Sequence, residues 1–114
     1  MIHYMSLNPE PFYLIQSGQK DIELRLLDEK RQMIRCGDII EFTNIENGEC
    51  KLKAVVAALH KFKSFDELYE ALPLLRCGYT NQNIDRASPS DMDFYYSKEK
   101  QQRYGVVGIE IRLI

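Results

Sequence analysis

Three charged side chains lie close together near the start of the chain, just after its first glycine. Residues 18–25 read GQKDIELR and include the ammonium of Lys20, the carboxylate of Glu23 and the guanidinium of Arg25. In an extended strand alternate side chains share one face, so Glu23 and Arg25 project together, and Lys20 approaches them from the preceding turn. Such a cluster offers several hydrogen-bond donors and one strong acceptor to a polar, planar ligand such as a nucleobase.

The same cluster has two other interpretations. Alternating charged strand faces are common on protein surfaces, where ion pairs contribute less than about 1 kcal/mol each. In an enzyme, Lys20 could act as a base or nucleophile, and Glu23 could activate a water molecule that attacks an amide. The neighbouring carboxylates of Asp21 and Glu23 favour the charged form of Lys20, which suits binding better than nucleophilic catalysis.

Aromatic side chains form a second group of candidates. Tyr95 and Tyr96 are adjacent in the sequence, and Tyr79 and Tyr104 lie in the same part of the chain. Stacking of a base on an aromatic ring contributes about 1–3 kcal/mol per base, so these tyrosines are candidate stacking surfaces, Tyr95 and Tyr96 above all. The alternative for each is structural: the ring packs on the sheet and the hydroxyl stays in solvent.

The remaining basic and histidine side chains have mainly structural interpretations. His60 shares the inward parity of its strand, which predicts a hydrogen-bonded histidine in the core or at its rim rather than a catalytic one. Two basic pairs, Lys30-Arg31 and Lys51/Lys53, are typical of solvent-facing turns and strands, although they could contact phosphates. We therefore place none of these residues in the candidate site.

The cysteine pattern argues against a disulfide framework and against a metal site. The sequence contains three cysteines, Cys36, Cys50 and Cys77, with no C-x-x-C pair. Their odd number and the lack of a visible secretory signal favour reduced thiols in the cytoplasm. No base flanks any of them in the sequence, so a nucleophilic role is not expected. The two histidines have no further ligand at zinc-site spacing, and we expect neither a metal nor another cofactor.

Length and composition are those of one soluble globular domain spanning residues 1–114. Hydrophobic residues make up 45% of the 114 residues and charged residues 28%. No apolar stretch approaches the roughly 20 residues of a membrane span, so we expect a cytoplasmic protein without membrane contact. The net charge of −2 disfavours a protein that holds a long duplex by its phosphates, but it allows a local patch or a pocket for a single nucleotide.

The first 62 residues are predicted to contain most of the sheet. After an apolar run at residues 1–7, Asn8 and Pro9 begin a helix that Gly18 ends. The strands predicted next cover residues 21–26, 39–44 and 50–62, with an exposed connection at 28–32. Asn47-Gly48 is typical of a tight hairpin, and the strand that follows is apolar on both faces, which places it in the middle of the sheet.

The rest of the chain is predicted to hold short helices and one closing strand. Ser64 and Glu67 form a capping box for a helix at 65–72, and two short helices follow at 88–96 and 98–104. In the last strand the inward residues are Val107, Ile109, Ile111 and Leu113. Hairpin-linked strands with few helices between them favour an α+β fold around a mostly antiparallel, barrel-like sheet.

The motif in residues 18–25, G-x-K-x-x-E-x-R, resembles that of the ASCH domain family. A second motif, Gly37-Asp38-x-Ile40-x-Phe42, and the positions of the helix at 65–72 and of the closing strand extend the likeness over nearly the whole chain. The resemblance implies a PUA-like β-barrel with flanking short helices and a cleft beside the barrel that binds RNA or nucleoside-like ligands. Our leading hypothesis is a domain whose cleft is lined by Lys20, Glu23, Arg25, Tyr95 and Tyr96.

The resemblance also suggests an enzymatic alternative. Some small bacterial ASCH proteins are N4-acetylcytidine amidohydrolases that use a lysine, a threonine and a glutamate. Lys20 matches their lysine, whereas Glu23 stands in the position of their threonine. The carboxylates in the corresponding C-terminal region are Asp85, Asp91 and Asp93. If the protein is an enzyme, Lys20 and Glu23 are its predicted catalytic residues and an acylated nucleoside its predicted substrate. A protein-interaction module is the third function class that the sequence leaves open.

Overall fold

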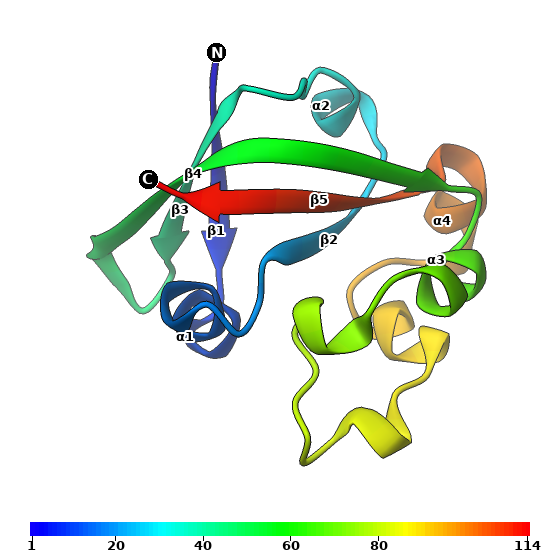
Figure 1. Ribbon diagram of the computed structural model, residues 1–114. Coiled ribbons are helices and arrows are strands. Elements are labelled where there is room, and N and C mark those ends of the chain that lie inside the picture. Colours follow the sequence, from blue (N-terminus) through cyan, green and yellow to red (C-terminus); the bar gives the residue numbers. More distant parts are fainter.

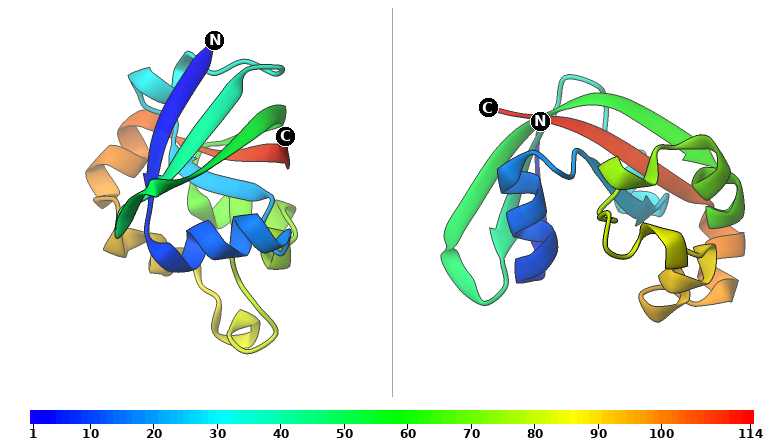
Figure 2. Two further views of the ribbon diagram at one scale, coloured as in Figure 1. Left: turned by 90° about the vertical axis from the view of Figure 1, so that its left-hand side faces the viewer. Right: turned by 60° about the horizontal axis from the view of Figure 1, so that its bottom comes forward.

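Five strands form one strongly curled sheet in the computed structural model, which describes residues 1–114 (Figure 1). The strands are β1 (Ile2–Leu7), β2 (Ile22–Leu26), β3 (Ile39–Asn44), β4 (Asn47–Phe62) and β5 (Val106–Leu113). Their order is β1-β3-β4-β5-β2, so β1 and β2 are the two edges and β4 is central, as predicted. The β1–β3 pair is parallel and the other pairs are antiparallel. The prediction of an α+β fold on a mostly antiparallel, barrel-like sheet is confirmed, with the sheet curled into a half-barrel (Figure 2).

Short helices connect the strands. They are α1 (Pro9–Ser17), α2 (Glu29–Gln32), α3 (Phe65–Ala71) and α4 (Lys98–Tyr104), with 3₁₀ helices η1 (Leu74–Arg76), η2 (Ile84–Arg86) and η3 (Pro89–Phe94). Helix α1 follows β1, whereas α3, the 3₁₀ helices and α4 all belong to the long connection between β4 and β5. The views in Figure 2 show α1 on one side of β2 and the long connection on the other.

Two clusters of buried apolar side chains hold these elements together. The larger cluster includes Met5, Leu7, Phe12, Ile15, Ile34, Ile40, Phe42, Ala54, Val56, Val107, Ile109 and Ile111. The second contains Ile22, Leu24, Leu26, Phe65, Leu68, Cys77, Met92 and Val106. Full burial of each large aliphatic or aromatic side chain contributes about 1.5–3 kcal/mol. Because the apolar side chains of β2 belong to the second cluster, the side chains that alternate with them along β2 point away from that cluster.

The structure adds to or corrects several details of the sequence predictions. The exposed connection at residues 28–32 contains a short helix, which Asp28 caps by accepting a hydrogen bond from the Arg31 backbone N–H at 3.0 Å. Leu113 is 42% exposed rather than inward, since β2 begins opposite Glu110 and leaves the last part of β5 paired with β4 alone. Asn8 begins α1, but its side chain makes no capping hydrogen bond.

The carboxylate of Asp38 ties the edge strand β1 to the turn that precedes β3. It accepts hydrogen bonds from His3 Nε2 at 2.8 Å and from the Arg35 backbone N–H at 3.0 Å. The His3 bond, followed by the Arg35 bond, lowers the pKa of Asp38 to about 2. Asp38 therefore stays ionised and holds β1 in its parallel register with β3, which in turn places the end of β1 beside the candidate site.

Replacing this carboxylate should weaken the fold in a pH-dependent way. A carboxyl group whose folded pKa is lowered stabilises the native state above its ordinary pKa, and this contribution is lost as the pH falls through the folded value. We expect Asp38→Asn to lower the melting temperature by several degrees at pH 7, with the difference shrinking between about pH 4 and pH 2. Thermal melts followed by circular dichroism measure this. The exposed Asp85→Asn is the control, and a constant Asp38→Asn deficit down to pH 2 would contradict the interpretation.

Candidate functional site

A cleft of about 620 Å³ is lined by α1 and the end of β1 on one side and by the long connection on the other. The residues of β2 and of the turn before it that line the cleft are Lys20, Glu23, Leu24 and Arg25. The end of β1 and α1 contribute polar groups that include Ser6 and Glu10. The long connection contributes a largely aromatic wall made of Tyr69, Tyr79, Phe94, Tyr95 and Tyr96. The volume is sufficient for a ligand the size of a nucleoside.

A buried glutamate lies between two cations in this cleft. Glu23 is only 4% exposed, and its two carboxylate oxygens lie 2.6 Å from Lys20 Nζ and 2.7 Å from Arg25 Nε. Lys20 is itself buried, at 8% exposure. Arg25 extends further and donates from Nη2 to the backbone carbonyl of Ser6 at 3.2 Å, which connects the two edge strands β2 and β1. The three predicted residues thus meet at one place in the cleft.

The local sequence explains why these side chains point into the cleft. Alternation along β2 sends Ile22, Leu24 and Leu26 toward the second hydrophobic cluster, so Glu23 and Arg25 take the opposite face. Gly18 ends α1 with a left-handed backbone at φ 88°. In the turn between α1 and β2, the Lys20 backbone N–H then donates a hydrogen bond to the Leu14 carbonyl at 3.0 Å.

A glycine in the long connection, Gly78, packs against the side chain of Lys20. Gly78 has a φ of +115°, and a Cβ built there would lie 3.4 Å from Lys20 Cδ. Because a side chain at this position would be both strained and close to Lys20, glycine suits it best. The position of Lys20 therefore depends on the long connection as well as on β2.

The electrostatics of the cluster favour fully charged groups. Burial raises the pKa of the Glu23 carboxyl, but the charges of Lys20 and Arg25 outweigh burial and hold that pKa below its ordinary value. Burial lowers the pKa of the Arg25 guanidinium, yet the Glu23 carboxylate more than compensates and raises it. The contacts with Glu23 and Ser6 leave part of the hydrogen-bonding capacity of both cations unused. The cluster can therefore present N–H donors to a ligand.

Both predicted stacking residues line the cleft, but they differ in exposure. The Tyr96 ring stacks on Phe65 with centroids 6.2 Å apart and an interplanar angle of 14°. Burial raises the pKa of the Tyr96 hydroxyl. Tyr95 is 60% exposed and lies at the outer part of the wall. Tyr96 therefore combines a packing role with access to the cleft, whereas Tyr95 is free on its outer side.

A chain of hydroxyl groups fixes the wall opposite the charged cluster. Tyr79 donates to Asp91 Oδ2 at 2.6 Å, and Tyr69 therefore donates to the Tyr79 hydroxyl at 2.7 Å. Burial and the bond to Asp91 raise the pKa of Tyr79. Tyr79 and Asp91 were sequence candidates only as members of larger sets, and Tyr69 was not among the candidates. Contacts between residues so far apart in the sequence have no signature in local spacing.

Phe94 also lines the cleft and was not among the sequence candidates. It directly precedes Tyr95 and Tyr96, so the run of consecutive aromatic residues was the signal that could have identified it. Cys77 lines the cleft as well, but burial raises the pKa of its thiol to about 11, which disfavours the nucleophilic thiolate.

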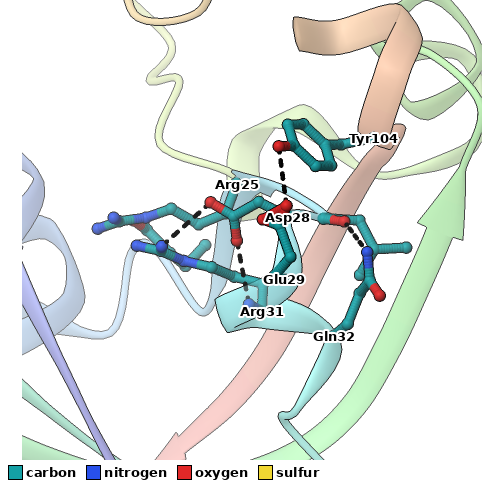
Figure 3. A network of polar contacts seen from close by, with 8 residues as sticks. Arg25, Asp28, Glu29, Arg31, Gln32 and Tyr104 are labelled. Carbon is teal, nitrogen blue, oxygen red and sulfur yellow. Dashed lines mark hydrogen bonds and ion pairs between the residues drawn. The ribbon is translucent and has the colours of Figure 1, made fainter.

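Several other sequence candidates lie outside the cleft. Tyr104 donates to Glu29 at 2.9 Å, and Arg31 pairs with Asp28, both next to α2 (Figure 3). Lys30 and Arg31 line a separate, smaller cavity of about 170 Å³ beside β1. No group of three or more histidine, cysteine, aspartate and glutamate side chains is arranged to hold a metal ion. No helix is sufficiently long and apolar to span a bilayer.

His60 lies at the rim of the sheet, where its Nε2 is 2.9 Å from Glu110 Oε1. This agrees with the structural interpretation of a hydrogen-bonded histidine. The inward parity assigned to it was wrong, because a register irregularity between Val56 and Ala58 shifts the alternation, and Leu59 packs against the larger cluster instead.

Residues 5–114 match the ASCH domain model. The chain belongs to the ASCH domain family. No curated protein sequence matches the chain.

Several solved structures have a similar fold. The hypothetical protein PH0355 has a TM-score of 0.82 and 36% sequence identity, with 100% of both chains covered. Protein PF0455 from Pyrococcus furiosus has a TM-score of 0.76 and 36% identity, with 100% of this chain and 98% of that chain covered. The ASCH protein from Zymomonas mobilis shares the fold, with a TM-score of 0.68, 15% identity and coverage of 97% of this chain and 66% of that chain.

Removing the charge of Glu23 tests the ion-pair cluster in this ASCH domain. Glu23→Gln keeps the shape but leaves Lys20 and Arg25 close together without an anion, so we expect a loss of about 3 kcal/mol in unfolding free energy at pH 7. Because the folded pKa of Glu23 is lowered, its contribution is present above the ordinary glutamate pKa of about 4.3 and is lost as the pH falls through the folded value. Urea unfolding at a series of pH values measures the difference.

A matched control is available in the same cleft. Glu10 is an exposed carboxylate that also lines it, and Glu10→Gln should stay within about 0.5 kcal/mol of the wild type at every pH. A Glu23→Gln variant that is as stable as Glu10→Gln at pH 7 would show that the buried ion pairs do not hold the cleft.

Proposed function

We propose that this ASCH domain binds RNA or a free nucleotide, with one nucleoside unit in the cleft of Lys20, Glu23 and Arg25. The observation that carries the proposal is the position of Glu23, buried between two cations on the side of the cleft that faces an aromatic wall. The N–H groups of Lys20 and Arg25 suit the acceptor atoms of a base edge or a ribose. Tyr95 and Tyr96 supply ring faces on the opposite wall for stacking.

The charge of the chain favours an unpaired strand or a single nucleotide over a duplex. The net charge is −2, and both cations of the cleft already contact the Glu23 carboxylate. Affinity for a duplex comes largely from many cationic contacts to phosphates, which this cleft does not offer. Single-stranded RNA is instead recognised through exposed base edges and stacking, and the cleft contains groups for both.

The same cluster is poorly suited to hydrolysis. A general base works best when its pKa lies near the operating pH, whereas the two cations hold the pKa of Glu23 below its ordinary value. Lys20 Nζ is already engaged by that carboxylate at 2.6 Å, so it is not free to attack a substrate. These features support binding rather than cleavage of an acylated nucleoside.

Titrations with wild type and variants test the binding proposal. Fluorescence anisotropy with a short labelled single-stranded RNA, and competition by free nucleosides and nucleotides, measure the affinities. We expect Lys20→Ala and Arg25→Lys to weaken binding at least tenfold, because each removes donors aimed at the ligand. Lys53→Ala, an exposed lysine of β4 outside the cleft, is the control and should bind as the wild type does. Equal affinities for all three variants, or undetectable binding by the wild type at low salt, would refute the proposal.

An assay with N4-acetylcytidine distinguishes binding from catalysis. The ultraviolet spectrum of the nucleoside in the presence of purified protein should not change with time, because the two cations hold the pKa of Glu23, the predicted general base, below its ordinary value. Spectral change that requires both Lys20 and Glu23 would instead assign the amidohydrolase activity to this chain.

A further inference from the structure

Two aromatic side chains of the cleft wall are turned mostly toward solvent. Phe94 is 87% exposed and Tyr95 is 60% exposed, and their ring centroids lie 5.2 Å apart in an edge-to-face arrangement. Both rings border the cleft that contains the charged cluster. Single exposed apolar residues are common, but adjacent exposed aromatic rings beside a concave site are typical of a contact surface.

The segment that carries these rings is firmly attached to the rest of the fold. Met92 is buried in the second hydrophobic cluster, and Ser88 and Asp91 form a complete capping box at the start of η3. Gln101 donates from Nε2 to Asp93 Oδ1 and to the Tyr96 carbonyl, both at 2.9 Å. Phe94 and Tyr95 are therefore displayed on an ordered backbone, which reduces the entropy lost when a ligand contacts them.

The three consecutive aromatic residues divide into an inner and an outer part. Tyr96 packs on Phe65 and so belongs to the inner wall, whereas Phe94 makes its only aromatic contact with Tyr95. The short 3₁₀ geometry of about three residues per turn directs neighbouring side chains to different sides. A ligand that fills the cleft beside Tyr96 therefore has a second ring surface available just outside it.

The charges beside Phe94 do not exclude a phosphate. Asp93, the adjacent carboxylate, is in contact with Lys98 at 3.4 Å and with Gln101. The backbone of a strand can therefore pass this carboxylate without facing an unpaired negative charge. An uncharged aromatic ring with a neutralised neighbour suits an unstacked base better than a phosphate.

We infer that the ligand of this domain is a single-stranded RNA segment of at least two nucleotides, with one nucleotide in the cleft and the base of the next stacked on Phe94. The inference rests on the proposed function and adds a second position to it. Stacking is tolerant of base identity, so the second position contributes affinity with little sequence preference. The structure thereby assigns Phe94 a role in setting ligand length.

Calorimetric titrations with matched small ligands test this inference. The ligands are the four ribonucleosides, their 3′- and 5′-monophosphates and the dinucleoside monophosphates ApA, CpC, GpG and UpU. We expect at least one dinucleoside monophosphate to bind about tenfold more tightly than the corresponding monophosphates, which isolates the second base from the phosphate. Phe94→Ala should abolish this gain, Phe94→Trp should preserve it, and Tyr4→Ala, an exposed aromatic of β1 outside the cleft, should leave it unchanged.

The outcomes separate this inference from the proposed function. Nucleoside binding that depends on Lys20 but gains nothing from a second base, or a gain that survives Phe94→Ala, would overturn the inference and keep the function. No binding of any ligand would overturn both. Phe94-dependent self-association in size-exclusion chromatography, without any gain from the second base, would assign the exposed rings to a contact between copies of this chain and also overturn the inference.

Discussion

The arrangement of the cleft depends on one buried carboxylate that keeps its charge. Taking Glu23 out of water is costly, and only the close approach of Lys20 and Arg25 compensates for that cost. The requirement works in both directions, because the carboxylate also fixes the two cations that would otherwise move as long, flexible side chains. Arg25 then reaches the Ser6 carbonyl and joins edge strands that do not pair with each other. The same contacts therefore position the proposed ligand-binding groups and join the two edge strands.

The site exists because the two faces of β2 lie against different parts of the fold. Its apolar residues pack with α3 and the long connection, which leaves the opposite face for charged groups beside β1 and α1. The long connection also returns to the cleft, where Gly78 packs against Lys20 and the Tyr69–Tyr79–Asp91 chain fixes the aromatic wall. Both walls are held by contacts that do not use the remaining N–H groups of Lys20 and Arg25. The cleft is therefore formed before a ligand arrives, which lowers the entropic cost of binding.

Local sequence patterns predicted most elements and the composition of the charged cluster. The period of two along β2 correctly placed Glu23 and Arg25 on one face, and the apolar character of β4 correctly placed it at the centre of the sheet. What covers a face cannot be read from its period, so the burial of Glu23 became apparent only in the structure. The register irregularity near Val56 reversed the expected side of His60 for a similar reason, since a bulge depends on the partner strand. Phe94 was not among the sequence candidates because what distinguishes it is its exposure beside the cleft, which only the structure shows.

The ionisation of Glu23 in the folded protein tests this account most directly. Carbon-13 labelling of the glutamate side chains and NMR detection of the carboxyl carbon across an acid titration report its pKa without any substitution. The account predicts a midpoint for Glu23 below that of the exposed Glu10 in the same spectra, because two cations stabilise the charged form. A midpoint above that of Glu10 would mean that burial outweighs the ion pairs, and the cluster could not then hold the cleft as described.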